Sequence, residues 1–501
     1  MATARQRYEK LVTERQPYLD RARECAKLTI PSLIPPDSSN GTTKFVTPYQ
    51  GLGARGVNNL ASKLMLAILP ANAPFFRLSI DDYTLEELTE QEGMRAEVEE
   101  ALNRIERAVQ NDIETTGVRP SVFEALRHLT CAGNTMLYLL PDGGMKVYRM
   151  DHYVVRRDGS GNPLEMITVE MIAPSAIPEE VQPLIKDLDP ESDKDLELYT
   201  RIYRMGQRYY YYSEINDTLV PGTEGEIPID KCPWIPLRFV KVDGEHYGRS
   251  YVEEYLGDLK TLEALTAAIT EGSAAAAKII FFVDPNGVTR AKVLETTPNL
   301  GVASGNANDI TVLRLEKFAD FRVAMETAAK IEERLSLAFM MNSSVQRGGD
   351  RVTAEEIRYV AGELDDALGG VYSILSMELQ MPLVSAKMHL LEKARKLPSL
   401  PKDSVRPQIT AGMEALGRGH DLAKLTAFLD LLMPLEQASP GIVSEYLNMG
   451  DFIKRCGTGL TIDMKGLVRT QEEVEQVRQQ REMEQMMSQM APGMMPQQPT
   501  E

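Results

Sequence analysis

Cysteine is scarce in this sequence, with four residues among 501. Cys25, Cys131, Cys232 and Cys456 lie far apart and form no C-x-x-C pair, so they indicate neither a disulfide framework nor a zinc site. The five histidines also lack metal-ligand spacings such as H-E-x-x-H. We therefore predict a protein of a reducing compartment that binds no metal and no cofactor.

Long hydrophobic runs are missing as well. The most apolar stretch, residues 64–70, is far shorter than the roughly 20 residues that a membrane-spanning helix needs. The N-terminal sequence MATARQRYEK has no apolar segment typical of a signal peptide. These absences predict a soluble, unexported chain with no membrane partner, in which the Asn-x-Ser/Thr matches at Asn40, Asn216 and Asn342 occur by chance.

An excess of positive charge is absent too, because the net charge is -18 and the pI is about 5.0. This balance argues against a protein that reads a nucleic-acid sequence, since such proteins neutralise phosphates with Lys and Arg. An acidic wall can still let DNA pass without holding it. The sequence also contains no G-x-x-x-x-G-K-[ST] and no G-x-S-x-G, so an ATP-driven step would fall to another protein.

The length and the hydrophobic periodicity predict an α+β chain that is predominantly α-helical. A chain of 501 residues is too long for one core, so we expect two to four domains. Helical patterns occupy residues 5–28, 52–69, 84–116 and 122–132. Short alternating runs between residues 135 and 239, separated by Asp-Gly, Gly-Asn and Pro signals, predict antiparallel strands.

A second pattern predicts a stalk with a small head. Ser250 and Glu253 form a helix-start signature ahead of a helix that reaches the alanine-rich run near residue 278. Strand-like segments and turns follow between residues 279 and 318, and a helix returns over residues 321–341. Two helices that bracket a compact insert are an unusual shape for an isolated monomer.

Residues 334–384 predict a helix, a polar loop and then a very long helix. Thr353 and Glu356 form a capping box, and apolar residues then recur at steps of three and four toward about Arg395. Pro382 is expected to kink this helix because it cannot donate a hydrogen bond to the Glu378 carbonyl. Shorter helices are predicted at 409–416, 422–432 and 442–455, followed by a charged segment and a tail rich in Gln, Pro and Met.

Two loops invite a functional interpretation. Gly51, Gly53 and Gly56 match the dinucleotide fingerprint G-x-G-x-x-G, which leaves a dinucleotide-binding oxidoreductase as an alternative. The preceding KFVTPYQ is a poor strand and no series of alternating strands and helices follows, so a tight loop packed against a helix start is favoured.

The second loop, residues 343–351, presents long donors beside two glycines. These donors are Gln346, Arg347 and Arg351. Either it is an ordinary solvent loop or it faces a polyanion, for which a single copy with a net charge of +1 would have slight affinity.

Three long blocks carry further information. They are GARGVNNLASKLMLA from Gly53, GEHYGRSYVEEYLGDLKTLE from Gly244, and residues 334–384. These blocks resemble a known family, the head-tail connector (portal) proteins of T7-like short-tailed bacteriophages. The similarity runs from about Tyr8 to Arg418 and weakens in the tail. The resemblance implies a portal-protein fold with wing, stem, clip and crown, assembled as a ring.

The implied regions follow the chain in order. They are the wing (1–248), the first stem helix (249–278), the clip (279–320), the second stem helix (321–341), the tunnel loop (342–352), the long wing or spine helix (353–397), the crown (398–465) and a partly disordered C-terminal tail (466–501).

The resemblance also implies a non-enzymatic role and a set of partners. The expected assembly is a dodecameric ring at one capsid vertex, through which double-stranded DNA is packaged and ejected without sequence preference. Expected protein partners are the terminase, the tail adaptor protein, the major capsid protein, the scaffolding protein and internal core proteins. The protein would lie in the virion and, during assembly, in the host cytoplasm; another phage tail or scaffold protein without a channel remains a further alternative.

Site residues follow from the same resemblance. The tunnel loop would face DNA through Gln346, Arg347 and Arg351. The stem lining would include Glu253, Lys260 and Lys278. The clip would contact terminase and adaptor through Asp284, Asn286, Arg290 and Lys292.

Overall fold

The computed structural model describes most of the first 341 residues and shorter segments after them. The described ranges are 3–70, 75–79, 94–177, 181–185, 194–276, 280–298, 301–313, 318–341, 370–397, 408–411 and 425–434, with a few single residues. The chain divides into two compact units, one made of Met1–Asn72 with Arg107–Lys402 and the other of Ala73–Glu106 with Asp403–Glu501. Helices and antiparallel strands both contribute, as predicted.

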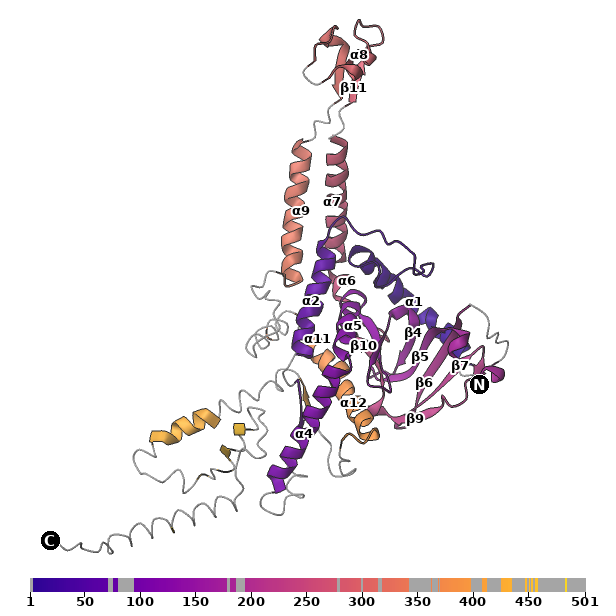
Figure 1. The fold of residues 1–501 in the computed structure, drawn as a ribbon, viewed down its shortest axis with the longest axis vertical. Helices are drawn as coiled ribbons and strands as arrows, with labels where there is room; N and C mark the ends of the chain where they lie inside the picture. Colours follow the sequence, from indigo (N-terminus) through magenta and orange to yellow (C-terminus); the bar gives the residue numbers. More distant parts are fainter. Residues whose placement is uncertain are drawn as a thin grey trace, which may run out of the picture. The chain divides into compact units, whose positions relative to one another are not determined.

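Helices run through the whole first unit, from its body to a projecting hairpin of two helices (Figure 1). They are α1 (Ala4–Leu28), α2 (Leu52–Ile68), α5 (Val118–Ala132), α6 (Tyr251–Glu254), α7 (Leu256–Ala276), α8 (Ala291–Thr296), α9 (Phe318–Ala338), α11 (Val371–Leu375) and α12 (Met381–Lys393), while α4 (Met94–Thr115) runs across the boundary between the units. α1 begins with a capping box, because Thr3 accepts from the Gln6 N–H and Gln6 reaches back to Thr3. α1, α2 and the second stem helix lie close to their predicted ranges.

A six-stranded antiparallel sheet lies within residues 153–228. It is called the wing sheet here because the resemblance predicts a wing over residues 1–248. Its order is β4 (Tyr153–Arg157), β5 (Pro163–Ile172), β6 (Leu196–Met205), β7 (Arg208–Ile215) and β8 (Thr218–Leu219), with β9 (Gly225–Pro228) also paired to β7. α1 covers one face, where Tyr8 and Leu11 pack against Val154, Ile167 and Tyr199. The short alternating runs of the sequence thus become strands with one buried face.

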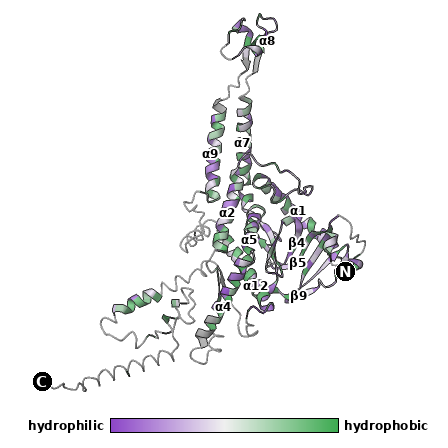
Figure 2. Ribbon diagram, in the orientation of Figure 1, coloured by the Kyte–Doolittle hydropathy of each residue, from purple (hydrophilic) through white to green (hydrophobic). Residues whose placement is uncertain are grey.

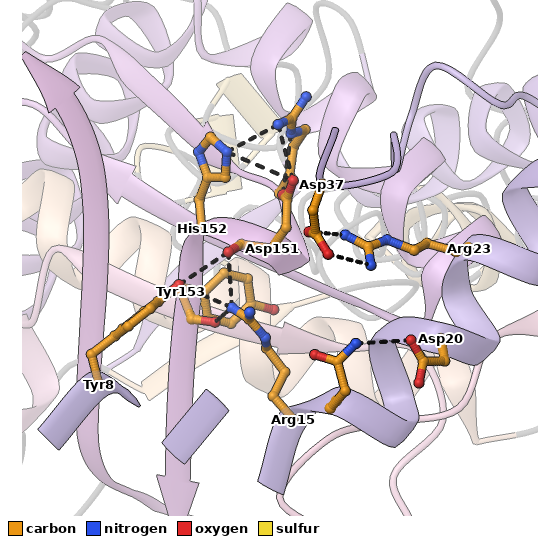
Figure 3. Close-up of polar contacts among 10 residues, drawn as sticks. Tyr8, Arg15, Asp20, Arg23, Asp37, Asp151, His152 and Tyr153 are labelled. Carbon is orange, nitrogen blue, oxygen red and sulfur yellow. Dashed lines mark hydrogen bonds and ion pairs between the residues drawn. The ribbon is translucent and has the colours of Figure 1, made fainter. Parts of the chain in front are cut away.

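Side chains satisfy the free edge of β4. The Arg15 guanidinium donates to the Tyr153 carbonyl at 2.9 Å, and the Val155 N–H donates to the Tyr247 hydroxyl at 3.0 Å. The Arg157 N–H donates to His246 Nδ1 at 3.3 Å. Figure 3 shows Arg15 reaching Tyr153 beside the backbone of Asp151. Edge groups that a further strand would otherwise use are therefore occupied.

A second, three-stranded sheet joins the wing sheet to the helices. Its order is β10 (Trp234–Arg238), β2 (Asn134–Leu139) and β3 (Met145–Tyr148). The Trp234 ring stacks on Tyr138 with centroids 4.8 Å apart. Gly133 ends α5 with a φ of 74°, and a Cβ there would lie 2.5 Å from the Arg249 carbonyl carbon. This turn therefore requires glycine in order to bring α5, β2 and the start of α6 together.

The helix that contains Pro382 is irregular just before the proline, where the sequence predicts a kink. α11 passes into a π-helical turn, Ser376–Gln380, and α12 starts at Met381 with Pro382 in its first turn. A proline is tolerated in a first helical turn, where its missing N–H is needed least. The π turn, Ser376–Gln380, is the only departure from α-helical hydrogen bonding between Val371 and Lys393. The helix ends at Lys393, near the predicted end.

Buried polar groups fix this helix against the first unit. The Glu378 carboxylate accepts from the Arg238 backbone N–H and Nε, each at 3.0 Å. Gln380 Nε2 donates to the Ile68 carbonyl at 2.6 Å. The Lys387 ammonium is fully buried between α4, α12 and the turn that joins β2 to β3.

The second unit contains an antiparallel pair, β1 (Phe76–Ser79) with β13 (Gln408–Ala411). The predicted helix at 409–416 is wrong for these residues, because their backbone pairs with a strand more than 300 residues earlier. The Leu78 N–H also donates to Glu106 Oε1 at 2.7 Å. Residues 425–434 are helical, as predicted, whereas the region predicted as disordered tail and most of the predicted helix 442–455 lie outside the described residues.

Burial also controls the reactivity of the cysteine thiols. Cys25, Cys131 and Cys232 are buried and unpaired, and burial raises their thiol pKa values to about 12, 11 and 12. Since the thiolate is the reactive form, we expect a native chain at pH 8 to react with a thiol reagent at Cys456 alone. The number of thiols titrated should rise from one to four on unfolding in urea. Rapid native reaction of two or more thiols would contradict the burial of these side chains.

Among the described residues, no helix is both long enough and apolar enough to cross a membrane.

Candidate functional site

The most distinctive element of the first unit is the helical hairpin of α6, α7 and α9. The Ser250 hydroxyl accepts from the Glu253 N–H and starts α6, as the sequence predicts. The predicted single helix is interrupted at Tyr255, and α7 then begins at Leu256. The Tyr251 hydroxyl donates to the Ala338 carbonyl at 2.7 Å and so ties the base of α6 to the end of α9.

Aromatic rings fill the base of the hairpin. The fully buried Phe339 ring lies 5.6 Å from Tyr251 and 5.9 Å from Tyr255, centroid to centroid. Asn59 Nδ2 donates to the Phe339 carbonyl at 2.9 Å, which holds α2 against the end of α9. The hairpin therefore starts from a rigid base.

The hairpin becomes more exposed away from this base. Leu259, Leu262 and Leu335 are fully buried near it, whereas farther along the hairpin α7 and α9 touch through Gly272 and the Phe321 ring. Only four of the 21 residues of α7 are charged, and Figure 2 shows hydrophobic residues along both helices. A helix with few charged residues normally lies in an interior, and α7 is such a helix. α9 carries more charge but also exposes Val323, Met325 and Leu337, so the hairpin has apolar surface that one chain leaves uncovered.

The glycine motif before α2 serves packing. The described residues before it, 3–50, contain no strand, and a Cβ at Gly53 would lie 2.6 Å from the Leu28 carbonyl oxygen. A Cβ at Gly56 would lie 2.6 Å from the Phe339 ring. The two glycines thus let α2 approach α1 and the base of the hairpin, as the favoured interpretation of this motif predicts.

A small head stands between α7 and α9 in the sequence. β11 (Ile280–Val283) pairs antiparallel with β12 (Ile310–Leu313), and α8 lies between them. Thr289 is buried within this head: its N–H donates to Asp309 Oδ2 and its hydroxyl donates to the Asn306 carbonyl, both at 3.0 Å. This matches the stalk and head that the sequence predicts.

A sequence profile of the family described as bacteriophage head to tail connecting protein matches residues 1–468. The chain belongs to this connector family. It is 45% identical over 478 residues to the portal protein of Escherichia phage T7, covering 94% of this chain and 88% of the relative. The corresponding values are 44% over 481 residues for the portal protein of Enterobacteria phage T3, with 94% and 89% covered, and 31% over 473 residues for that of Enterobacteria phage SP6, with 94% and 90% covered.

Among solved structures, the neck of an empty gene transfer agent particle matches with 14% identity and a TM-score of 0.39, covering 75% of this chain and 86% of that one. This overlap is too small to add to the assignment. The sequence comparisons support a portal protein of the head-tail connector, and they give no support to the oxidoreductase alternative.

The predicted stem-lining residues occupy different settings in the connector. Glu253 is three-quarters buried and accepts from Arg249 at 3.0 Å, with Arg21 3.4 Å away. Lys260 projects from α7 and pairs with Glu24 of α1. Lys278 lies outside the described residues, and a channel role for all three stays a prediction.

The network around Glu253 was not foreseen from the sequence. Arg249 bridges Glu245 and Glu253, and its hydrogen bonds to Glu245 are the main cause of its raised pKa. The Tyr18 ring lies beneath two guanidiniums, with Arg21 Cζ 4.7 Å and Arg249 Cζ 5.7 Å from its centroid. The i,i+4 spacing of the two glutamates around Arg249 is a signal that could have suggested it.

All four predicted clip residues are exposed on one short segment of the head. Asp284 forms a turn in which its carboxylate accepts from the Asn286 N–H at 2.9 Å. Arg290 precedes the first residue of α8 and Lys292 lies in its first turn. All four side chains therefore lie on accessible surface within residues 284–292. Their contact with a partner stays a prediction.

Gln346, Arg347 and Arg351 lie outside the described residues, as does most of the predicted long helix before residue 370.

Proposed function

We propose that twelve copies of this connector form a ring at one vertex of a phage capsid and that double-stranded DNA passes through the ring. The observation that carries this proposal is the hairpin of α7 and α9, whose apolar surface exceeds what one chain buries. Val323 and Leu337 of α9 remain 61% and 62% exposed. Neighbouring hairpins arranged around an axis would cover such surface, and a closed ring uses one head-to-tail contact repeated.

Charge supports a conduit rather than a DNA-holding protein. Each copy carries -18, so a ring of twelve is strongly acidic and repels DNA on average. Each firm phosphate contact would add affinity and salt dependence, which would slow passage. A loop with Arg347 and Arg351 from every copy would supply a local basic girdle that restrains packaged DNA without fixing it.

The other surfaces fit the remaining steps of assembly. The clip head, with Asp284, Asn286, Arg290 and Lys292 exposed, would bind the terminase during packaging and the tail adaptor afterwards. The wing sheet would meet the major capsid protein and the scaffolding protein, and the crown would meet internal core proteins. The connector would thus act as a structural platform, with catalysis left to the packaging motor.

Negative-stain electron microscopy of the purified chain, combined with a light-scattering mass, tests the ring. We expect particles with an axial hole and a mass near twelve protomers. A monomer or dimer without a hole, stable across salt and protein concentration, would reopen the interpretation as a tail or scaffold protein.

The girdle has its own test. Replacing Arg347 and Arg351 with glutamate should lower the amount of DNA retained in filled heads and leave the rings intact, because each copy loses its two cationic loop side chains. The control reverses Lys10 and Arg156, which are exposed on α1 and β4. Unchanged retention in the loop variant, measured as DNA per particle after packaging, would remove the tunnel-loop assignment.

A further inference from the structure

Residues 39–49, here called the arm, form an ordered excursion between α1 and α2. The arm contains no helix or strand, and its turn is held by polar contacts around Asn40. Asn40 Oδ1 accepts from the Thr42 hydroxyl at 2.8 Å and from the Thr43 hydroxyl at 3.0 Å, while the Asn40 N–H donates to Thr43 Oγ1 at 2.9 Å. The arm is therefore shaped by its own hydrogen bonds rather than by a core.

The end of the arm is fastened to α7. Glu263 accepts from the backbone N–H groups of Tyr49 and Gln50, at 3.0 and 3.1 Å. The Tyr49 hydroxyl donates to Glu271, two turns further along α7, at 3.1 Å. These contacts hold the end of the arm along the hairpin.

The arm and α9 lie on opposite flanks of α7. At 100° per residue, Glu263 and Glu271 lie on the face of α7 opposite Asp258 and Gly272. These two residues contact α9, through Arg334 and the Phe321 ring respectively. Figure 1 draws the arm and α9 on different sides of α7. One chain therefore presents the arm on one flank of its hairpin and the outer face of α9 on the other.

The arm carries side chains that its own chain does not use. Val46 is 89% exposed, although a valine normally contributes to stability by burial. Lys44 is exposed, and within the described part of the chain it has no ion-pair partner. An apolar and a cationic side chain thus stand two residues apart, at most about 7 Å along the chain.

The outer face of α9 carries an exposed apolar side chain and an exposed anionic one, which complement those of the arm. Val323 is 61% exposed, and Glu326, one turn along the helix, is exposed and has no ion-pair partner among the described residues. Positions three apart on a helix lie on one face, about 5–6 Å from each other. This apolar and anionic pair has the spacing that the arm requires.

The end of the arm and the first turns of α9 stand at similar levels of the hairpin. Tyr49 is fastened between Glu263 and Glu271, and the Phe321 ring, two residues before Val323, packs on Gly272. Rotation about an axis along the hairpin keeps each residue at its level, so groups at one level on opposite flanks meet between neighbouring copies.

We propose that the arm of each connector docks on α9 of the next copy, with Val46 against Val323 and Lys44 facing Glu326. The arm would then act as a clasp between adjacent subunits that lies outside the contact between the hairpins themselves. This inference rests on the proposed ring, whose own test is independent of it.

Disulfide trapping tests the clasp in the full-length chain. In a Cys456→Ser background, Val46→Cys combined with Val323→Cys should give, on mild oxidation, a ladder of covalent multimers on denaturing gels. Each single variant should give no ladder, because the remaining native cysteines are buried. Microscopy of the same samples before oxidation shows whether rings are present.

The outcomes separate the two proposals. Rings that yield no ladder from the double variant would overturn the clasp and leave the ring standing. Chains that form no rings at all would count against the proposed function first, and the clasp would fall with it. A ladder that ends at dimers would indicate a two-fold contact and would also overturn the head-to-tail arrangement.

Charge exchange supplies a second readout that does not depend on oxidation. Lys44→Glu and Glu326→Lys should each shift the protein concentration at which rings dissociate upward, by about fivefold or more, since like charges then face each other. The combined exchange should restore the parental value, whereas additive shifts would contradict the pairing. An unchanged thermal unfolding midpoint, followed by Trp234 fluorescence, would show that each variant chain still folds.

Discussion

Replacement of Lys387 by methionine should lower the free energy of unfolding by about 3–5 kcal/mol. Its ammonium donates to Asp112 Oδ2 at 2.6 Å, to Thr116 Oγ1 at 2.8 Å and to the Gly143 carbonyl at 2.7 Å. All three protons of the buried group are therefore used. Methionine preserves most of the side-chain volume but leaves the Asp112 carboxylate without its cation. An unpaired buried charge is what makes the loss of one partner of a buried ion pair so destabilising.

The measurement is the urea midpoint of the Trp234 fluorescence transition, which reports on this unit because Trp234 is the sole tryptophan. Lys393→Met, on the exposed last turn of the same helix, is the matched control and should change little. Asp112→Leu added to Lys387→Met should recover part of the loss, since no charge is then left unpaired. Equal effects of the Lys387 and Lys393 variants would show that the buried pair does not hold α12 in place.

Phe339→Ala should destabilise the connector by a similar amount, about 3–5 kcal/mol. The ring is fully buried between Tyr251, Tyr255 and α2, so its loss leaves a cavity at the base of the hairpin. Because the hairpin starts there, we also expect fewer complete rings in micrographs of this variant. Normal ring yield together with an unchanged urea midpoint would contradict the role given to this ring.

Gly56 offers a coupled test of the same site. Gly56→Ala should cost about 1–3 kcal/mol, because the new Cβ would press on the Phe339 ring. In the Phe339→Ala background the same change should cost little or even stabilise, because the methyl then enters the cavity. Gly257→Ala, where the added Cβ meets nothing within 4 Å, is the control and should be neutral or slightly stabilising.

Local signals accounted for most of the elements that could be compared. The Ser250 cap, the helix of residues 52–69 and the alternating strands of the wing sheet each depend on a few adjacent residues, and the structure confirms all three. The hairpin with its small head followed from the order of helix and strand patterns. The family assignment followed from long matched blocks, which carry far more information than a short motif.

Long-range partners explain what the sequence did not show. Residues 409–411 were predicted as helix because the strand that pairs with them, Phe76–Ser79, lies more than 300 residues away and gives no local signal. The contact of Arg238 with Glu378 and that of Lys387 with Asp112 join elements separated by 140 and 275 residues, and no local pattern marks them. Tyr255 interrupts the predicted helix where the aromatic base of the hairpin forms.

For the predicted clip residues, the sequence indicates where the side chains lie but not which protein they bind. Sequence order put Asp284 and Lys292 near each other, and exposure followed from their chemistry. Which protein they bind depends on a surface of another molecule, so neither pattern nor fold can supply it.

The side chains along the free edge of β4 bear on how such a protein survives before it is assembled. The proposed ring would concentrate many identical sheets in a small volume, and newly made chains would meet one another at random before they reached it. A bare strand edge on each would invite unregulated stacking of one sheet onto another, the first step toward fibres. Because Arg15, Tyr247 and His246 occupy that edge with directional bonds, the wing sheet is closed to extension from this side. Free chains can therefore meet through other surfaces, but not by adding a strand to this edge of the wing sheet.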